Sequence, residues 1–126
     1  MGQTNVTEVD FERLSALSRA VRTSPRPERA ALLEGRLRSA SILPGDSLGS
    51  KTVKMGSAIT ILDKDRKETF SYNLVFPVEA DITQGRISVL TPLGASLLGR
   101  KEGEGFSYES PGGMVNVEVL EVIHDL

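Results

Sequence analysis

The sequence contains no cysteine and no tryptophan, and it has one histidine among 126 residues. The absence of cysteine excludes a disulfide framework, a thiolate metal site and thiol redox chemistry, and it is typical of proteins in a reducing cytosol. No apolar run approaches the roughly 20 residues that span a bilayer, and the first residues lack the basic and apolar pattern of a signal peptide. We therefore expect a cytoplasmic protein that makes no contact with a membrane.

Charge is unevenly distributed along the chain, although the net charge is only −2. Residues 1–48 hold seven basic and six acidic side chains, and every basic one is Arg, whereas residues 49–126 hold eight basic and eleven acidic side chains. The change falls at "LPGDSLGS", residues 43–50, which has the Pro, Gly, Asp and Ser content of a linker. We predict two units, comprising residues 1–48 and residues 49–126.

The first unit has the pattern of an antiparallel helical hairpin. Thr7 and Asp10 resemble a capping box, and apolar residues then follow at spacings of three and four, which predicts a helix over residues 8–22. Ser24 is a candidate cap for a second helix, in which Pro25 and Pro27 fall within the first turn. The apolar positions of that helix are Ala30, Leu33, Leu37 and Ala40. Arms of about 15 residues would project only ~22 Å.

The second unit has the pattern of a small antiparallel sheet crossed by one short helix, and the predicted fold class is therefore α+β. The segments "SAITILD", "TFSYNLVF", "RISVL", "GFSYES" and "MVNVEVLEV" are rich in β-branched and aromatic residues. Thr91 and Pro92 provide a helix cap and a first-turn proline for "PLGASLLG". In the last strand, alternation predicts that Val115, Val117 and Val119 face the core while Asn116 and Glu118 face solvent.

A set of ordered motifs within residues 53–122 resembles the C-terminal, FKBP-like domain of the Gre transcript-cleavage factors. The motifs are "GS", "EAD", "IS", "TPLGASLLG" and "PGG". A helical hairpin before such a domain is the layout of the Gre factors. Because the predicted hairpin is short, the chain resembles more specifically the regulator of nucleoside diphosphate kinase family, whose members bind RNA polymerase.

The resemblance implies a regulator that binds the rim of the RNA polymerase secondary channel as a monomer. It implies no cofactor and no enzymatic activity. The residues that match the family's contact motifs are Glu79, Asp81, Ser88 and Pro92, and we expect them on or beside the contact surface. Each also has an ordinary structural interpretation, because Asp81 is typical of a turn, Ser88 of a strand and Pro92 of a helix start.

The predicted hairpin tip, "TSPRPE", lacks the residues that metal-assisted cleavage of RNA needs. A Gre factor resembles a probe that delivers paired carboxylates to a magnesium ion, and a hard cation requires such oxygen ligands. Here Glu28 is the single acidic residue between Glu12 and Glu34, and the other charged residues at the tip are Arg22, Arg26 and Arg29. We predict that Glu28 pairs with a guanidinium and that the tip binds no metal and stimulates no cleavage. The tip arginines are either a solvated surface or a weak nucleic-acid contact within the polymerase complex.

Two other functions remain open from the residues alone. An FKBP-like fold suggests a prolyl isomerase, but fold analogy is a weak argument and Phe70, Tyr72 and Phe76 alternate along one strand as core residues do. The fold could also serve as a protein-binding module with an unrelated partner. "GEGFSY" and "DKDRKE" lack the residues of a nucleotide loop and a calcium loop.

Overall fold

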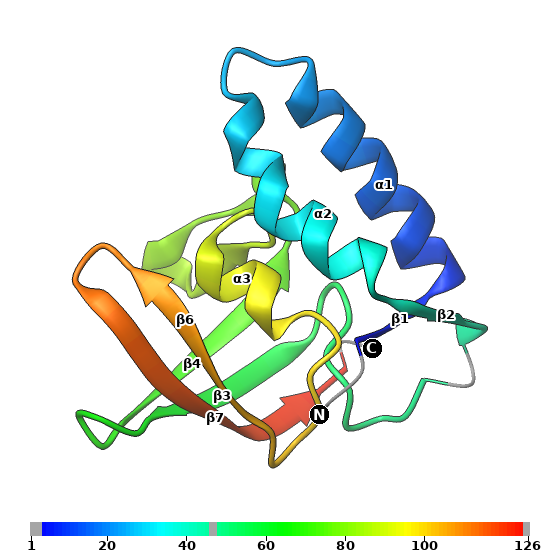
Figure 1. Ribbon diagram of the computed structural model, residues 1–126. Helices are drawn as coiled ribbons and strands as arrows, with labels where there is room; N and C mark the ends of the chain where they lie inside the picture. The colour runs from blue at the N-terminus through cyan, green and yellow to red at the C-terminus, as the bar shows by residue number, and fades with distance from the viewer. Residues whose placement is uncertain (1–3, 46–47, 125–126) are drawn as a thin grey trace.

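The computed structural model describes residues 4–45 and 48–124. Helices α1 (Glu8–Arg22) and α2 (Ala31–Arg38) form an antiparallel hairpin that stands on one side of a sheet, with helix α3 (Pro92–Leu97) between the hairpin and the sheet (Figure 1). None of the helices in the described ranges is long and apolar enough to cross a membrane.

Helix α1 has the predicted bounds, and Thr7 is its cap. The Oγ1 atom of Thr7 accepts a hydrogen bond of 3.1 Å from the amide of Asp10. The carboxylate of Asp10 does not complete a capping box. It accepts a hydrogen bond of 3.0 Å from the amide of Met55 instead, which ties the first turn of α1 to the second unit.

The second arm of the hairpin is shorter than predicted, because a 3-10 turn precedes it. Residues Pro27–Ala30 form this turn, η1, and α2 contributes only eight residues. The predicted capping role of Ser24 is wrong. Its hydroxyl donates to the carbonyl of Val21 and accepts from the amide of Arg26, which closes the turn after α1, and Arg26 precedes η1 without a side-chain cap.

Two short strands that the sequence did not predict close the base of the hairpin. Strands β1 (Asn5–Thr7) and β2 (Ser41–Leu43) pair in parallel, with Val6 opposite Ile42. Leu43, the first residue of the predicted linker, therefore belongs to β2, and residues 46 and 47 of that segment lie outside the described residues. The pairing holds the two ends of the hairpin together.

The second unit contains a five-stranded sheet in the order β5-β4-β3-β7-β6, and the α+β prediction is confirmed. The strands are β3 (Ala58–Asp63), β4 (Glu68–Val75), β5 (Arg86–Ser88), β6 (Gly105–Ser110) and β7 (Gly113–Ile123). One pair departs from the antiparallel prediction, because β5 lies parallel to β4. Between them the chain forms two 3-10 turns, η3 (Pro77–Glu79) and η4 (Ile82–Gln84), and returns in its original direction.

A β-bulge in β7 changes which residues face the core. Val119 pairs with Ile61, but Glu121 pairs with Thr60, so Leu120 is an extra residue in the ladder. Leu120 is consequently exposed. The predictions for Val117 and Val119 (core) and for Asn116 (solvent) are confirmed, whereas Val115 and Glu118 are each half-buried and Val122 joins the core beyond the bulge.

The two predicted units share one apolar core. The hairpin contributes Leu14, Leu33 and Leu37 to the same cluster of buried side chains as the sheet. Leu93 and Leu97 of helix α3 lie in that cluster as well, together with Leu98, which follows the helix. The hairpin is therefore held against the second unit by apolar packing as well as by the hydrogen bond of Asp10.

Candidate functional site

The predicted contact residues lie on the connection between β4 and β5 and on the start of α3. Glu79 ends η3 and is exposed, and Asp81 precedes η4 and is also exposed. Pro92 is the exposed first residue of α3, whereas Ser88 is half-buried at the end of β5. The structure thus places two of the four on one exposed loop, residues 77–84, which we call the η3–η4 loop.

Asp81 organises the η3–η4 loop. Its Oδ1 atom accepts hydrogen bonds from the amide and the hydroxyl of Thr83, at 3.1 and 2.6 Å. Its backbone exchanges two hydrogen bonds of 2.9 Å with Arg86. The Thr83 hydroxyl and, to a smaller extent, the charge of Arg86 lower the pKa of Asp81 below its ordinary value, so the surface carries a fixed negative charge at neutral pH.

Ser88 and Pro92 both have structural roles that their sequence context indicated. The Ser88 hydroxyl accepts a hydrogen bond of 3.1 Å from the amide of Leu90, and its carbonyl accepts from the amide and hydroxyl of Thr91. Thr91 in turn caps α3 through the amide of Gly94. Pro92 fits the first position of the helix, where no intrahelical donor is needed. Of the two, only Pro92 is exposed enough to offer a partner most of its surface.

Two apolar residues that the sequence analysis missed are exposed on the same loop. Val78 is 91% exposed and Ile82 is 65% exposed. Large apolar side chains that are exposed on one loop are typical of a surface that a partner covers. The signal in the sequence was weak, because "PVEADI" alternates apolar and acidic residues as a half-buried strand does.

A groove runs between the η3–η4 loop and helix α1. It has a volume of about 630 Å³. Its lining residues are Arg13, Ala16, Leu17, Phe76, Pro77, Val78 and Glu79. The guanidinium carbon of Arg13 lies 4.3 Å from the centre of the Phe76 ring, a cation–π contact that joins the two walls.

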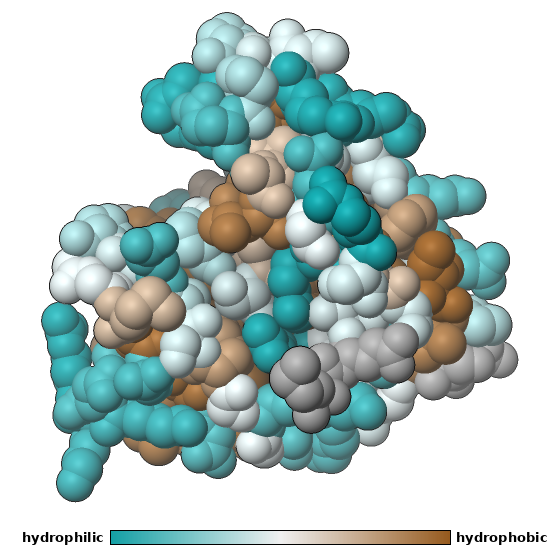
Figure 2. All heavy atoms as spheres, viewed as in Figure 1, coloured by the Kyte–Doolittle hydropathy of each residue, from teal (hydrophilic) through white to brown (hydrophobic). Residues whose placement is uncertain are grey.

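The hairpin tip has the ionic arrangement that the sequence predicted. The Nε atom of Arg26 lies 2.9 Å from Oε2 of Glu28, and this hydrogen bond lowers the pKa of the Glu28 carboxyl. Arg22 pairs with Glu34 on α2, at 3.0 Å. Hydrophilic residues cover most of the tip (Figure 2). No group of three metal-ligating side chains occurs among residues 4–45 and 48–124.

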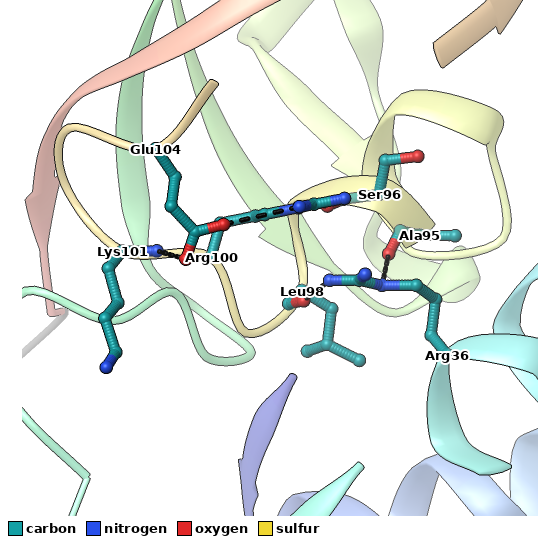
Figure 3. A network of polar contacts seen from close by, with 7 residues as sticks. All are labelled: Arg36, Ala95, Ser96, Leu98, Arg100, Lys101 and Glu104. Atoms are coloured by element: carbon teal, nitrogen blue, oxygen red, sulfur yellow. Dashed lines mark hydrogen bonds and ion pairs between the residues drawn. The ribbon is translucent and has the colours of Figure 1, made fainter. Parts of the chain in front are cut away.

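Arg36 of α2 fixes the hairpin to helix α3. Its Nε atom donates to the carbonyl of Ala95 at 3.1 Å, and its Nη2 atom donates to the carbonyl of Leu98 (Figure 3). These carbonyls lie at the end of α3, where a helix leaves acceptors without intrahelical donors. Burial, and then the charge of Arg100, lower the pKa of Arg36 to about 10, which still leaves it charged at neutral pH.

Arg100 and Glu104 form the other half of the network in Figure 3. The guanidinium of Arg100 donates to the carbonyl of Ser96 at 2.7 Å and to Oε2 of Glu104 at 3.3 Å. The second oxygen of Glu104 accepts from the amide of Lys101. The carboxylate of Glu104 therefore compensates the positive charges of Arg100 and Arg36 beside the end of α3.

A second hollow, of about 390 Å³, opens at the other end of the sheet. Phe70, Tyr72 and Tyr108 line it together with the carboxylate of Asp63. Burial raises the pKa of both phenols, so they are neutral hydrogen-bonding groups at physiological pH. Phe70 and Tyr72 are half-buried and pack against the apolar core, as the sequence indicated, and both also line this hollow.

Comparison with protein families and curated proteins gives a consistent result. The family described as "Transcription elongation factor, GreA/GreB, C-term" matches residues 48–124. The transcription elongation factor GreA of Syntrophobacter fumaroxidans is 37% identical over 103 residues, and that of Magnetococcus marinus is 34% identical over 94 residues. Each match covers 75% of this chain but only 65% and 60% of the relative, so the chain spans less than two thirds of these relatives.

Solved structures resemble the whole chain. The prokaryotic transcription elongation factor GreA/GreB from Nitrosomonas europaea has a TM-score of 0.78 at 28% identity, covering 98% of this chain and 100% of that one. Gfh1 of Thermus aquaticus has a TM-score of 0.54 at 22% identity, covering 99% and 100% of the two chains. The second likeness concerns the fold alone.

Proposed function

From the premise that this chain belongs to the GreA/GreB family of transcription elongation factors, we propose that it binds RNA polymerase and regulates transcription. The family match over residues 48–124 carries the proposal. The η3–η4 loop supports it, because Val78 and Ile82 are exposed beside the charged Asp81. An apolar centre beside charged groups is the usual composition of a protein-binding surface.

We further propose that the protein docks at the rim of the secondary channel and competes with Gre factors without stimulating cleavage, as a member of the regulator of nucleoside diphosphate kinase family. The hairpin supports this, because α1 has 15 residues and α2 has eight. A helix of 15 residues is about 22 Å long. The tip carboxylate of Glu28 is engaged by Arg26, so the tip offers no pair of free oxygen ligands to a magnesium ion.

A titration into core RNA polymerase that carries a labelled Gre factor tests the competition. We expect the label to be displaced and cleavage of a backtracked transcript to fall in the same concentration range. The reason is mass action, since two proteins that bind one site exclude each other. Unlabelled Gre factor is the control, because it displaces the label without reducing cleavage.

Two other outcomes would contradict parts of the proposal. Displacement with undiminished cleavage would mean that this protein has the cleavage chemistry itself. A label that stays bound at large excess, while the unlabelled Gre factor removes it, would show that the protein does not share the Gre site.

Replacing Asp81 with asparagine tests the η3–η4 loop. Asparagine keeps a side-chain oxygen that can accept from Thr83, so the loop should remain folded, but the negative charge is lost. We expect the thermal midpoint to stay unchanged and affinity for polymerase to fall severalfold. Glu109→Gln, an equal charge change on exposed β6, is the control. Equal affinities of the two variants would place Asp81 outside the contact.

The tip arginines have a subsidiary role in the proposal. Arg29 is exposed and forms no ion pair with the described carboxylates, whereas Arg22 and Arg26 are each paired with a glutamate. A guanidinium binds phosphate or carboxylate well. We propose that the tip touches nucleic acid only when the protein is bound to polymerase, where it acts as a monomer in the cytoplasm.

The hollow lined by Tyr72 and Tyr108 favours an alternative function, a peptide-binding or prolyl isomerase module of FKBP-like fold. Aromatic rings beside a few polar groups are typical of ligand pockets, and a volume of about 390 Å³ is large enough for a short peptide segment. An isomerisation assay on a proline-containing peptide tests it. Catalysis by the wild type that is lost in Tyr108→Ala would establish the alternative. An isomerisation rate equal to that measured without protein would exclude isomerase activity.

A further inference from the structure

The hollow of about 390 Å³ combines a buried carboxylate with three aromatic rings. Asp63, the last residue of β3, is 8% exposed and lines the hollow beside Phe70 and Tyr72 of β4 and Tyr108 of β6. We call these four side chains the aromatic cage. They come from three strands of one sheet, and none of them belongs to the η3–η4 loop, on which the proposed polymerase contact lies.

We propose that the aromatic cage binds an alkylammonium group, which is a positively charged amine on an apolar chain. The lysine side chain of a peptide and a free aliphatic amine both have this chemistry. The inference goes beyond polymerase binding and does not depend on it. It also assigns a positive charge to the ligand of this hollow, which the peptide-binding alternative does not specify.

The carboxylate of Asp63 is held through one oxygen and can accept through the other. Its Oδ1 atom accepts hydrogen bonds of 3.0 Å from the amides of Asp65 and Arg66, which fixes the carboxylate at the turn after β3. Within residues 4–45 and 48–124, Oδ2 accepts no hydrogen bond and Asp63 forms no ion pair. A buried charge is costly unless it is paired, so a cationic ligand would supply the missing partner.

The rings give a cation the surroundings that it needs. The rings of Phe70 and Tyr72 are nearly parallel, at 19°, with centroids 6.3 Å apart, so they form one aromatic wall. Tyr108 is their neighbour, because burial and then the charges of Tyr72 and Asp63 raise the pKa of its phenol. Neither phenol forms a hydrogen bond with another described residue. The face of an aromatic ring attracts a cation, and most strongly where water is excluded.

The charges at the hollow favour a cation over an anion. Asp63 and Asp65 line it against one guanidinium, that of Arg66. The side chain of Arg66 is exposed and forms neither an ion pair nor a cation–π contact in the part of the chain that the structure describes. The cage is therefore not filled by the protein's own cation. An anion would have to lie against the carboxylate of Asp63 and the negative faces of the rings.

Tyrosine fluorescence reports on this site alone. Tyr72 and Tyr108 are the two tyrosines of the sequence, which has no tryptophan, and both line the hollow. We expect titration with N-acetyl-lysine amide to give a saturable change in emission. N-acetyl-norleucine amide, which has the apolar chain without the charge, is expected to bind about tenfold more weakly or less.

Pentylamine distinguishes the two sources of the ammonium group. It has the charge and the chain of lysine but no peptide groups. Equal affinities for pentylamine and N-acetyl-lysine amide would identify a free amine as a sufficient ligand. Tighter binding of the lysine derivative would assign the cage to a lysine side chain of a peptide.

Three substitutions test the roles of the charges. Asp63→Asn keeps an oxygen that can accept from the two amides of the turn, but it should weaken binding of N-acetyl-lysine amide about tenfold or more. Arg66→Gln removes the opposing charge and should strengthen binding about two- to threefold. Glu109→Gln is the control, because Glu109 is exposed on the same strand as Tyr108 and does not line the hollow. It should change the affinity little.

Three results would overturn the inference. The first is no saturable fluorescence change and no heat of binding with N-acetyl-lysine amide. The second is equal affinity for the norleucine derivative, because the charge would then not be recognised. The third is weaker binding by Arg66→Gln, which would mean that the hollow selects anions, and this variant remains informative if circular dichroism shows that Asp63→Asn is unfolded. All these measurements use the protein alone, so the competition titration still decides polymerase binding separately.

Discussion

Replacing Gly94 with alanine is expected to destabilise the protein by about 3 kcal/mol or more. A Cβ atom at this position would lie 2.0 Å from the carbonyl oxygen of Ser88, 2.9 Å from its carbonyl carbon and 2.9 Å from Oγ1 of Thr91. Two of these are backbone atoms of the turn that Thr91 closes through its own hydrogen bonds to Ser88. The turn must therefore open, and the cap of α3 with it.

The consequence reaches beyond the turn, because α3 connects the sheet to the hairpin. Its buried leucines, Leu93 and Leu97, belong to the common core, and its last carbonyls hold Arg36. We expect Gly94→Ala to lower the thermal midpoint by about 10 °C or more, measured by circular dichroism.

Gly35→Ala is the matched control, with an expected effect of opposite sign. Gly35 lies inside α2, and a Cβ atom there would meet nothing within 4 Å. Alanine should stabilise the helix by about 0.5 to 1 kcal/mol, since glycine has the greater backbone freedom in the unfolded chain. If both variants shifted the thermal midpoint in the same direction, the close approach of Gly94 to Ser88 would not explain the loss of stability in Gly94→Ala.

Features encoded by adjacent residues could be predicted from the sequence. Thr7 and Thr91 each cap the helix that follows, and Gly99 ends α3 with a φ angle of +79°. In each case the determining contact lies within three or four residues of the chain, so a short pattern contains the information. The ion pair of Glu28 with Arg26 was predictable for the same reason.

Features that depend on distant partners could not be predicted. The pairing of β1 with β2 joins residues 36 positions apart, such as Val6 and Ile42, in strands of three residues each. The bulge at Leu120 is visible only from its partner strand, and it shifts the buried face from Val119 to Val122. A strict alternation of buried and exposed residues along β7 would have buried Glu121 in place of Val122.

The candidate site likewise has parts that could be predicted from the sequence and parts that could not. The motifs that contain Asp81 and Pro92 were singled out through the family resemblance, and both residues are exposed in the structure. The groove that Ala16 and Val78 line together exists only because α1 packs beside the η3–η4 loop. A surface assembled from two segments about 60 residues apart leaves no pattern in either one.

Val117→Asp is expected to unfold the protein at neutral pH. Val117 is 1% exposed and lies opposite Asp63 of β3, whose side chain is itself 8% exposed. Residues directly opposite on one face of a sheet have neighbouring side chains, so the new carboxylate would be buried beside another. An unpaired buried charge costs several kcal/mol, which is a large part of the about 5 to 15 kcal/mol that stabilises a typical domain.

The pH dependence of the stability of Val117→Asp shows whether the buried charge is what unfolds this variant. Burial and the neighbouring Asp63 should raise the pKa of the new carboxyl in the folded state, so its destabilising effect is relieved as the pH falls through that raised pKa. We expect Val117→Asp to gain stability relative to wild type between pH 7 and pH 5 in urea unfolding, and Val117→Asn to gain none. Met114→Asp, at a position on the same strand that is 61% exposed, should unfold within about 1 kcal/mol of wild type. If Val117→Asp and Met114→Asp lost the same amount of stability, the burial of position 117 would not be the reason that a carboxylate there destabilises the protein.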